Sequence, residues 1–340
     1  MNIVITGGAG FLGVRLARML LRRGKLSMAG SAPTAITALT LVDRYGPPDD
    51  LQADARVRVV TGDLNELLEQ NSPVAQVIRA EDAIIFHLAA AVSGECEADF
   101  DLGMRSNLDA SRALLELCRA LGSKPTFVFA SSLAVFGNSL EQPLPPIIDD
   151  RTLPTPQNSY GIQKFIGEQL TADYGRKGFV RARNVRLMTV SVRPGKPNGA
   201  ASSFLSGMLR EPLAGVRAVC PVAPDTPVAL SSPGRTIDGL LRAAEASDGD
   251  WGARTAINLP ALQTTPAAMA HALARAAGQE TADLIDWTPD PAISKIVTSW
   301  PATIDAARAR GLGLLPDGDF DSILAEYLSE NPRTAAARNQ

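Results

Sequence analysis

The stretch Asn2-Ile3-Val4-Ile5-Thr6-Gly7-Gly8-Ala9-Gly10-Phe11-Leu12-Gly13 decides the fold of this chain. Its first five residues predict a short buried strand, and residues 14–23 predict an amphipathic helix that ends at Gly24. The glycines between them let a turn bend sharply, let the backbone approach a pyrophosphate, and let the helix pack on the strand. The helix N-terminus then offers free N–H groups and a positive dipole end to the anion. The stretch therefore predicts a phosphate-binding turn, although its spacing is not G-x-G-x-x-G and a plain tight turn is the alternative.

Strands and helices continue to alternate after this unit. Helices are predicted over residues 98–121 and from Tyr160 to about Tyr174, and residues 25–36 are predicted to be a loop insertion. The predicted strands span residues 37–42, 56–61, 82–88, 126–131 and 185–192. Such alternation is typical of a parallel, doubly wound sheet.

The pattern becomes shorter and less regular after residue 195. Short strands are predicted at 218–220, 228–231 and 256–259, and helices at 200–210, 235–246, 266–275, 303–310 and 318–329. The predicted fold class is α/β, a Rossmann doubly wound parallel sheet with a smaller mixed α/β C-terminal substrate domain. Residues 1–183 are expected to form the nucleotide-binding domain, with 184–195 and part of 228–260 returning to it. Residues 196–330 are expected to form mainly the substrate domain, and 331–340 a polar tail.

Composition excludes several classes of protein. The 340 residues are 45% hydrophobic with a net charge of −3 and no block of like charges, so nothing favours nucleic-acid binding. The N-terminus has no positive region before its apolar run, and the longest apolar run, residues 83–92, is too short to span a bilayer. We therefore expect a cytoplasmic protein that binds a small molecule and no membrane.

Cysteine and histidine usage argues against disulfides and metals. Three widely spaced cysteines indicate reduced thiols, and two histidines far apart in sequence do not make a metal site. His87, in an apolar strand, is expected to be a packed, hydrogen-bonded side chain.

Two aspartates are candidates for holding a nucleotide. Asp43 ends the second strand, where a carboxylate can bind an adenosine ribose and would repel a 2′-phosphate. Arg44 could counter that repulsion, so the sequence favours NAD and leaves NADP possible. Asp63 could meet the adenine or serve as a helix N-cap, and Asp43 could be an ordinary turn residue.

A second motif lies four residues apart in Tyr160 and Lys164. In a helix both side chains share one face. A lysine ammonium beside a tyrosine favours the phenolate, which could then act as a base near neutral pH. Ser132, at the carboxyl end of the strand 126–131, could hydrogen-bond the same substrate oxygen. The alternative is an ordinary surface pair.

Taken together, these motifs resemble the extended short-chain dehydrogenase/reductase family. The resemblance implies a Ser132–Tyr160–Lys164 catalytic set, and Ser132 rather than Ser131 aligns with the family serine. It also implies a homodimer through the helices near 98–121 and 159–174. The residues implied to contact the cofactor are Gly7, Gly10, Phe11, Leu12, Asp43, Asp63, Leu64, Ala89, Ala91, Asn107, Tyr160 and Lys164.

Departures from other branches narrow the resemblance. Leu133 and Ala134 stand where sugar-nucleotide dehydratases carry Asp-Glu, and Gly234-Arg235 lacks the epimerase Arg-Asp-aromatic pattern. Residues 186–213 resemble the D-erythronate dehydrogenase branch, which implies NAD-dependent oxidation of the C2 hydroxyl of D-erythronate. The residues expected to hold this acid, besides Ser132 and Tyr160, are Lys196, Asn198, Ser202, Ser203 and Arg235.

Two other functions remain open at this level. One is a nucleotide-sugar epimerase or 4-reductase on the same scaffold. The other is a non-catalytic dinucleotide sensor, although such proteins usually lose the Tyr-x-x-x-Lys pair that is present here.

Overall fold

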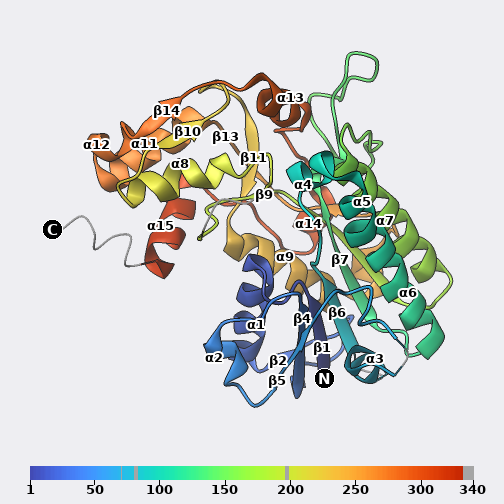
Figure 1. Ribbon diagram of the computed structural model, residues 1–340. Coiled ribbons are helices and arrows are strands. Elements are labelled where there is room, and N and C mark those ends of the chain that lie inside the picture. Colours follow the sequence, from blue (N-terminus) through green and yellow to red (C-terminus); the bar gives the residue numbers. More distant parts are fainter. Residues whose placement is uncertain (70, 80–82, 196–198, 332–340) are drawn as a thin grey trace.

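A seven-stranded parallel sheet forms the centre of the molecule in the computed structural model (Figure 1). The structure describes residues 1–69, 71–79, 83–195 and 199–331. The strands run in the order β12-β8-β7-β6-β1-β4-β5, and every neighbouring pair is parallel. Their bounds are β1 Asn2–Thr6, β4 Ala38–Asp43, β5 Val57–Thr61, β6 Ala83–His87, β7 Thr126–Ser132, β8 Arg181–Leu187 and β12 Ile257–Asn258. The predicted doubly wound α/β fold is confirmed.

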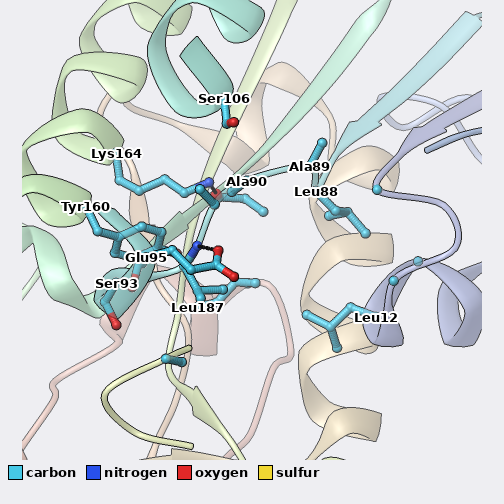
Figure 2. Close-up of a pocket in the computed structure, with 18 of the residues that line it drawn as sticks. Leu12, Leu88, Ala89, Ala90, Ser93, Glu95, Ser106, Tyr160, Lys164 and Leu187 are labelled. Atoms are coloured by element: carbon cyan, nitrogen blue, oxygen red, sulfur yellow. Dashed lines mark hydrogen bonds between the residues drawn. The ribbon is translucent and has the colours of Figure 1, made fainter. Parts of the chain in front are cut away.

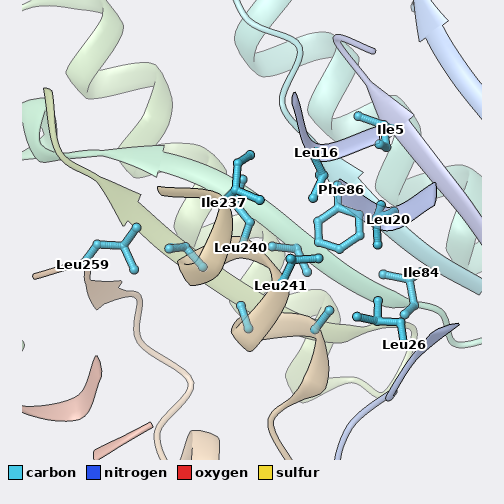
Figure 3. Packing of buried hydrophobic residues seen from close by; sticks show 14 of the residues in the cluster. Ile5, Leu16, Leu20, Leu26, Ile84, Phe86, Ile237, Leu240, Leu241 and Leu259 are labelled. Atoms are coloured by element: carbon cyan, nitrogen blue, oxygen red, sulfur yellow. The ribbon is translucent and has the colours of Figure 1, made fainter. Parts of the chain in front are cut away.

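Side chains of the central strands alternate between two buried faces. Ile3 and Ile5 of β1 pack against one set of helices, whereas Val4 packs against the other, as the two-residue period of a strand requires. The first face is covered by α1 Phe11–Arg23 and α9 Pro233–Glu245 (Figure 3). The second face is covered by α3 Pro73–Ile78, α6 Ala110–Leu121 and α7 Ser159–Arg176. Both faces are apolar, so the sheet is the core of the molecule.

Two local predictions were wrong, and a third was right to within two residues. The helix expected over 98–121 runs over residues 100–121 as α5 Phe100–Gly103, a π-helical turn η1 at Met104–Asp109, and α6, and a separate short helix, α4 Ser93–Ala98, precedes it. A break occurs at Asp99, whose extended backbone caps α5 through its side chain. The strand expected over 185–192 is divided at Met188 into β8 and β9 Thr189–Val190, because β9 leaves the central sheet to pair with β11. The predicted loop 25–36 contains a small antiparallel pair, β2 Lys25–Leu26 and β3 Thr34–Ala35.

A second core lies beyond the sheet, in the C-terminal half of the chain. It is built on a three-stranded sheet, β13-β11-β9, and a two-stranded parallel sheet, β10-β14. A helix over 291–299 was missed by the sequence analysis. The remaining elements are α2 Asp49–Gln52, η2 Leu133–Val135, α8 Phe204–Leu213, β10 Ala218–Cys220, β11 Val228–Ser231, α10 Asp248–Trp251, β13 Leu262–Thr264, α11 Pro266–Ala277, α12 Gln279–Ala282, β14 Ile285–Trp287, α13 Pro291–Ser299, α14 Ala307–Gly311 and α15 Phe320–Glu330.

Several C-terminal segments return to the central sheet. Helix α9 packs against α1, β12 extends the sheet beside β8, and α14 contributes Ala309 to the same core. The chain therefore crosses between its two cores more than once. Among the described residues, no helix is both long and apolar enough to cross a membrane.

Candidate active site

A pocket of about 500 Å³ opens at the carboxyl ends of the central strands. In open α/β sheets ligands bind at this edge, so its position alone marks it as a candidate site. It extends from the glycine turn after β1, past β4 and β6, to the start of α7 (Figure 2). The residues that line it and were predicted from the sequence are Gly7, Gly10, Phe11, Leu12, Asp43, Asp63, Leu64, Ala89, Ala91, Ser132, Tyr160, Lys164 and Ser202.

The glycine turn leaves no room for side chains. A Cβ on Gly13 would lie 2.1 Å from the Gly7 carbonyl oxygen, and one on Gly7 would lie 2.8 Å from the Ala89 nitrogen. Gly7 also has a φ of +71°, which favours glycine. The turn therefore brings bare backbone and the N-terminus of α1 to the pocket, as a pyrophosphate group would require.

Asp43 and Asp63 differ in what holds them. Asp43 accepts hydrogen bonds from the backbone N–H of Ala9 (3.0 Å) and of Tyr45 (3.3 Å), which fixes its carboxylate beside the glycine turn. Asp63 accepts from Asn65, and its ion pair with Arg44 (2.7 Å) helps to hold its pKa below the usual range. Arg44 makes an exposed ion pair with Asp63, whereas the fixed Asp43 carboxylate would repel a 2′-phosphate. This end of the pocket thus fits NAD.

Asn107 does not line the pocket. It is buried, its amide oxygen accepts from the Ala91 N–H (2.8 Å), and its amide nitrogen donates to Gln163 (2.8 Å). Any effect of Asn107 on a bound nucleotide would pass through the loop at Ala91, which does line the pocket.

Helix α7 places Tyr160 and Lys164 side by side in the pocket (Figure 2). The helix begins at Asn158, whose side chain accepts from the Gly161 N–H (2.8 Å) and caps the first turn. A Cβ on Gly161 would lie 2.1 Å from the Ala134 carbonyl oxygen, so this turn packs directly against η2, which follows Ser132. The close packing brings Tyr160 and Ser132 together from distant parts of the sequence.

The two adjacent serines face different partners. Ser131 is buried and donates to the Glu168 carboxylate (2.5 Å), behind the pocket. Ser132 lines the pocket, where its Oγ accepts from the Ala134 N–H (3.1 Å) and acts on the Tyr160 phenol to lower its pKa. Of the pair, Ser132 is thus the serine that can reach a substrate oxygen at Tyr160.

The expected effect of Lys164 on Tyr160 is not what the structure shows. Burial raises the pKa of Tyr160 above its ordinary value, while the Ser132 hydrogen bond and the charge of Arg193 oppose that rise. The Lys164 ammonium instead donates to the Ala130 carbonyl oxygen (2.8 Å) and lies 5.7 Å from the centre of the Tyr160 ring. Burial lowers the pKa of Lys164 to about 8. The catalytic role of Lys164 stays a prediction, since a helical spacing fixes the shared face but not where the long side chain ends.

The predicted substrate residues do not all meet at the pocket. Ser202 lines it, whereas Arg235 is exposed on the first turn of α9 and does not. Ser203 also lies outside the lining, and Lys196 and Asn198 lie outside the described residues. Thus Arg235, the arginine that the sequence analysis favoured, is not at the site.

Among the lining residues that sequence reasoning missed are Ser93, Glu95, Arg193 and Trp300. Arg193 follows β9, within the segment 186–213 that carried the resemblance, so its position in that segment was the available signal. Trp300 comes from the end of α13, far along the chain, and no local pattern connects it with the pocket. Its indole nitrogen is buried and has no hydrogen-bond partner among the described residues.

The described residues contain no cluster of histidine, cysteine, aspartate and glutamate that could hold a metal ion. His87 is buried between two hydroxyl groups, with Nδ1 2.7 Å from Thr6 Oγ1 and Nε2 2.9 Å from Ser111 Oγ. Burial, with a smaller effect of the Lys164 charge, lowers its pKa to about 3. It is therefore a neutral packed side chain, as expected.

Comparison with known proteins agrees with this geometry. Residues 3–225 match the model of the NAD dependent epimerase/dehydratase family. The chain is 52% identical to D-erythronate dehydrogenase of Cupriavidus necator over 97% of this chain and 98% of the relative. It is 40% identical to D-erythronate dehydrogenase of Haemophilus influenzae, over 96% and 99% of the two chains.

Solved structures show the same fold. A nucleoside-diphosphate-sugar epimerase from Agrobacterium tumefaciens superposes with a TM-score of 0.85 and 36% identity, over 98% of this chain and 95% of the other. L-threonine 3-dehydrogenase from Trypanosoma brucei gives a TM-score of 0.82 at 23% identity, over 98% and 97%, and this likeness concerns the fold alone.

Proposed function

The chain belongs to the NAD dependent epimerase/dehydratase family, and we propose that it oxidises the C2 hydroxyl of D-erythronate to 2-oxo-tetronate with NAD. The observation that carries this proposal is the 52% identity to a D-erythronate dehydrogenase along nearly the whole of both chains. The chain is thus an oxidoreductase, and NAD is its cofactor. The pocket supports the assignment because bare backbone, Asp43 and the Ser132–Tyr160 pair line one continuous space.

The chemistry divides between the cofactor and this chain. NAD, when bound, supplies the acceptor for the hydride that leaves C2. Tyr160 takes the proton of the C2 hydroxyl, so that the C2–O bond becomes a carbonyl. Ser132 positions that oxygen through its hydroxyl, which lines the same pocket as Tyr160.

The other residues of the pocket hold the nucleotide in this proposal. The backbone of Gly7, Gly10, Phe11 and Leu12 would face the pyrophosphate, and Asp43 the adenosine ribose. Lys164 would hold the nicotinamide ribose. Four further lining residues would contact the adenine and nicotinamide ends of NAD: Asp63, Leu64, Ala89 and Ala91. Asn107 would support Ala91 from behind through its hydrogen bond to the Ala91 N–H.

The test is NADH formation from D-erythronate, with L-threonate and UDP-sugars alongside. We expect NADH from D-erythronate and a loss of about 10²–10⁴-fold in kcat for Tyr160→Phe, the range of a general base. Normal turnover by Tyr160→Phe would remove Tyr160 from that role. Interconversion of a UDP-sugar without NADH would favour the epimerase alternative. Tight NAD binding without turnover of any acid or sugar would favour the sensor.

We also propose a homodimer. Helices α5 and α7 pack against each other and expose the apolar side chains of Phe100, Ile162 and Ile166. Burial of such side chains in a partner would stabilise a dimer. Light scattering should give a mass of twice 35.9 kDa, and a change of both isoleucines to glutamate should halve it. A monomeric wild type would refute the proposal.

The division of the chain into two parts and the cytoplasmic location of the protein are also proposals. We propose a nucleotide-binding part, residues 1–183 with the segments that return to the sheet, and a substrate part within 196–330, supported by two separate cores. Limited proteolysis should then cut first between them. Three buried, unpaired cysteines support a cytoplasmic location, which cell fractionation would test.

A further inference from the structure

Arg193 is held rigidly at the substrate end of the pocket. Its Nε donates to the Val190 carbonyl oxygen (3.1 Å), and its backbone N–H donates to Ser206 Oγ (3.0 Å). Its own carbonyl oxygen accepts from Arg210 Nη1 (2.9 Å). The strand β9 and the helix α8 thus fix both ends of the residue, while its side chain lines the pocket.

In the part of the chain that the structure describes, the charge of Arg193 is not compensated by an ion-paired carboxylate. Arg210, its cationic neighbour, is paired with Glu211, so the three residues together carry one net positive charge. Among the described residues no acidic side chain forms an ion pair with Arg193. Glu95, a carboxylate in the same pocket, accepts instead from the Val92 N–H. Arg193 is half-buried, and this burial lowers the pKa of its guanidinium. An uncompensated, partly desolvated cation is stabilised by an anionic ligand.

The position of this cation relative to Tyr160 restricts the ligand further. Arg193 and Tyr160 line the same pocket, and the charge of Arg193 is one of the causes that counteract the rise in the Tyr160 pKa. In a 2-hydroxy acid the carboxylate is bonded directly to the carbon that is oxidised. In an aldose or a sugar nucleotide no carboxylate stands at that place.

We propose that Arg193 binds the substrate carboxylate and selects 2-hydroxy acids for oxidation at C2, an assignment that rests on the proposed function. A guanidinium presents paired N–H groups that match a carboxylate, whereas lysine offers a point charge. Arg193 therefore takes the role that the sequence analysis gave to Lys196, Asn198 or Arg235. Because C2 is bonded to the carboxylate that Arg193 would bind, C2 is the carbon whose hydroxyl would face Tyr160.

The kinetic test compares Arg193→Gln and Arg193→Lys with Arg235→Gln, a matched change outside the pocket. For D-erythronate we expect Arg193→Gln to lower kcat/KM by about 10²–10³-fold, mainly through KM, as for a lost charge pair. Arg193→Lys should recover part of that loss. Arg235→Gln should leave KM within about two-fold, given its position outside the pocket. An unchanged KM in Arg193→Gln would overturn the proposal.

A binding experiment tests the carboxylate site of Arg193 independently of whether the substrate is oxidised. D-Erythronate added to enzyme with NADH should raise the melting temperature of wild type and of Arg235→Gln, but not of Arg193→Gln. A shift by NADH alone in all three shows that each is folded. If Arg193→Gln does not fold, Arg193→Lys takes its place in this comparison. A melting-temperature shift by D-erythronate as large as in wild type would then refute the need for a guanidinium. If no acid is oxidised but the shift depends on Arg193, the function fails and the carboxylate site stands.

Discussion

Glu168 and Arg186 form a buried ion pair behind the active site, and its removal should be costly. The Glu168 carboxylate accepts from Arg186 Nε (2.9 Å) and Nη2 (2.8 Å), and from Ser131 Oγ. The two side chains are only 1% and 5% exposed. Glu168→Gln keeps the shape but turns one acceptor oxygen into a donor facing Arg186, and it leaves the guanidinium buried without a charge partner.

We expect Glu168→Gln to lower the free energy of unfolding by about 3–5 kcal/mol, the cost of stranding one member of a buried pair. This is a large part of the roughly 5–15 kcal/mol by which a protein is stable. Arg186→Met should cost a similar amount, since it strands the carboxylate. The double variant should cost clearly less than the sum of the two, because neither member of the pair is then left buried with its charge unpaired.

Urea denaturation followed by tryptophan fluorescence would give these free energies for wild type, both single variants and the double variant. Asp173→Asn is the control, because its pair with Arg176 is exposed and should contribute no more than about 1 kcal/mol. Single-variant losses that add to within about 0.5 kcal/mol in the double would show that the two charges are not coupled. That result would refute the reasoning.

Three further predictions concern the site and the core. Because burial raises the pKa of Tyr160, NADH formation from D-erythronate should rise with pH from 7 upward, and a plateau already reached at pH 7 in the kcat/KM profile would contradict this. Asp43→Ala should weaken NAD binding, since the charge beside the ribose is lost. The preference for NAD over NADP, measured as the ratio of the two kcat/KM values, should fall by about ten-fold or more. His87 has a pKa of about 3 in the folded protein and ~6.5 when unfolded, so the unfolded state binds its proton first as the pH falls. Wild type should lose about 4 kcal/mol more than His87→Gln between pH 7 and pH 3 from this group, and equal losses in the two would refute the neutral, buried state of His87.

The sequence by itself determined the parts of this protein that depend on local order. The glycines at 7 and 10 predict the tight turn, Gly13 lets α1 pack against it, and the apolar run before them has the length of a buried strand. The four-residue spacing of Tyr160 and Lys164 predicted that they share one face of a helix, and both line the pocket.

Contacts between distant segments were decided only by the tertiary structure. The split of the predicted strand at Met188 depends on a partner, β11, some forty residues further along the chain. The direction of the Lys164 side chain depends on the Ala130 carbonyl oxygen, and that of Arg193 on Val190 and α8. The spacing of residues along a chain limits which side chains can contact each other, whereas burial and charge pairing decide which contacts form. For this reason Arg235 lies in solvent and Arg193 lines the pocket.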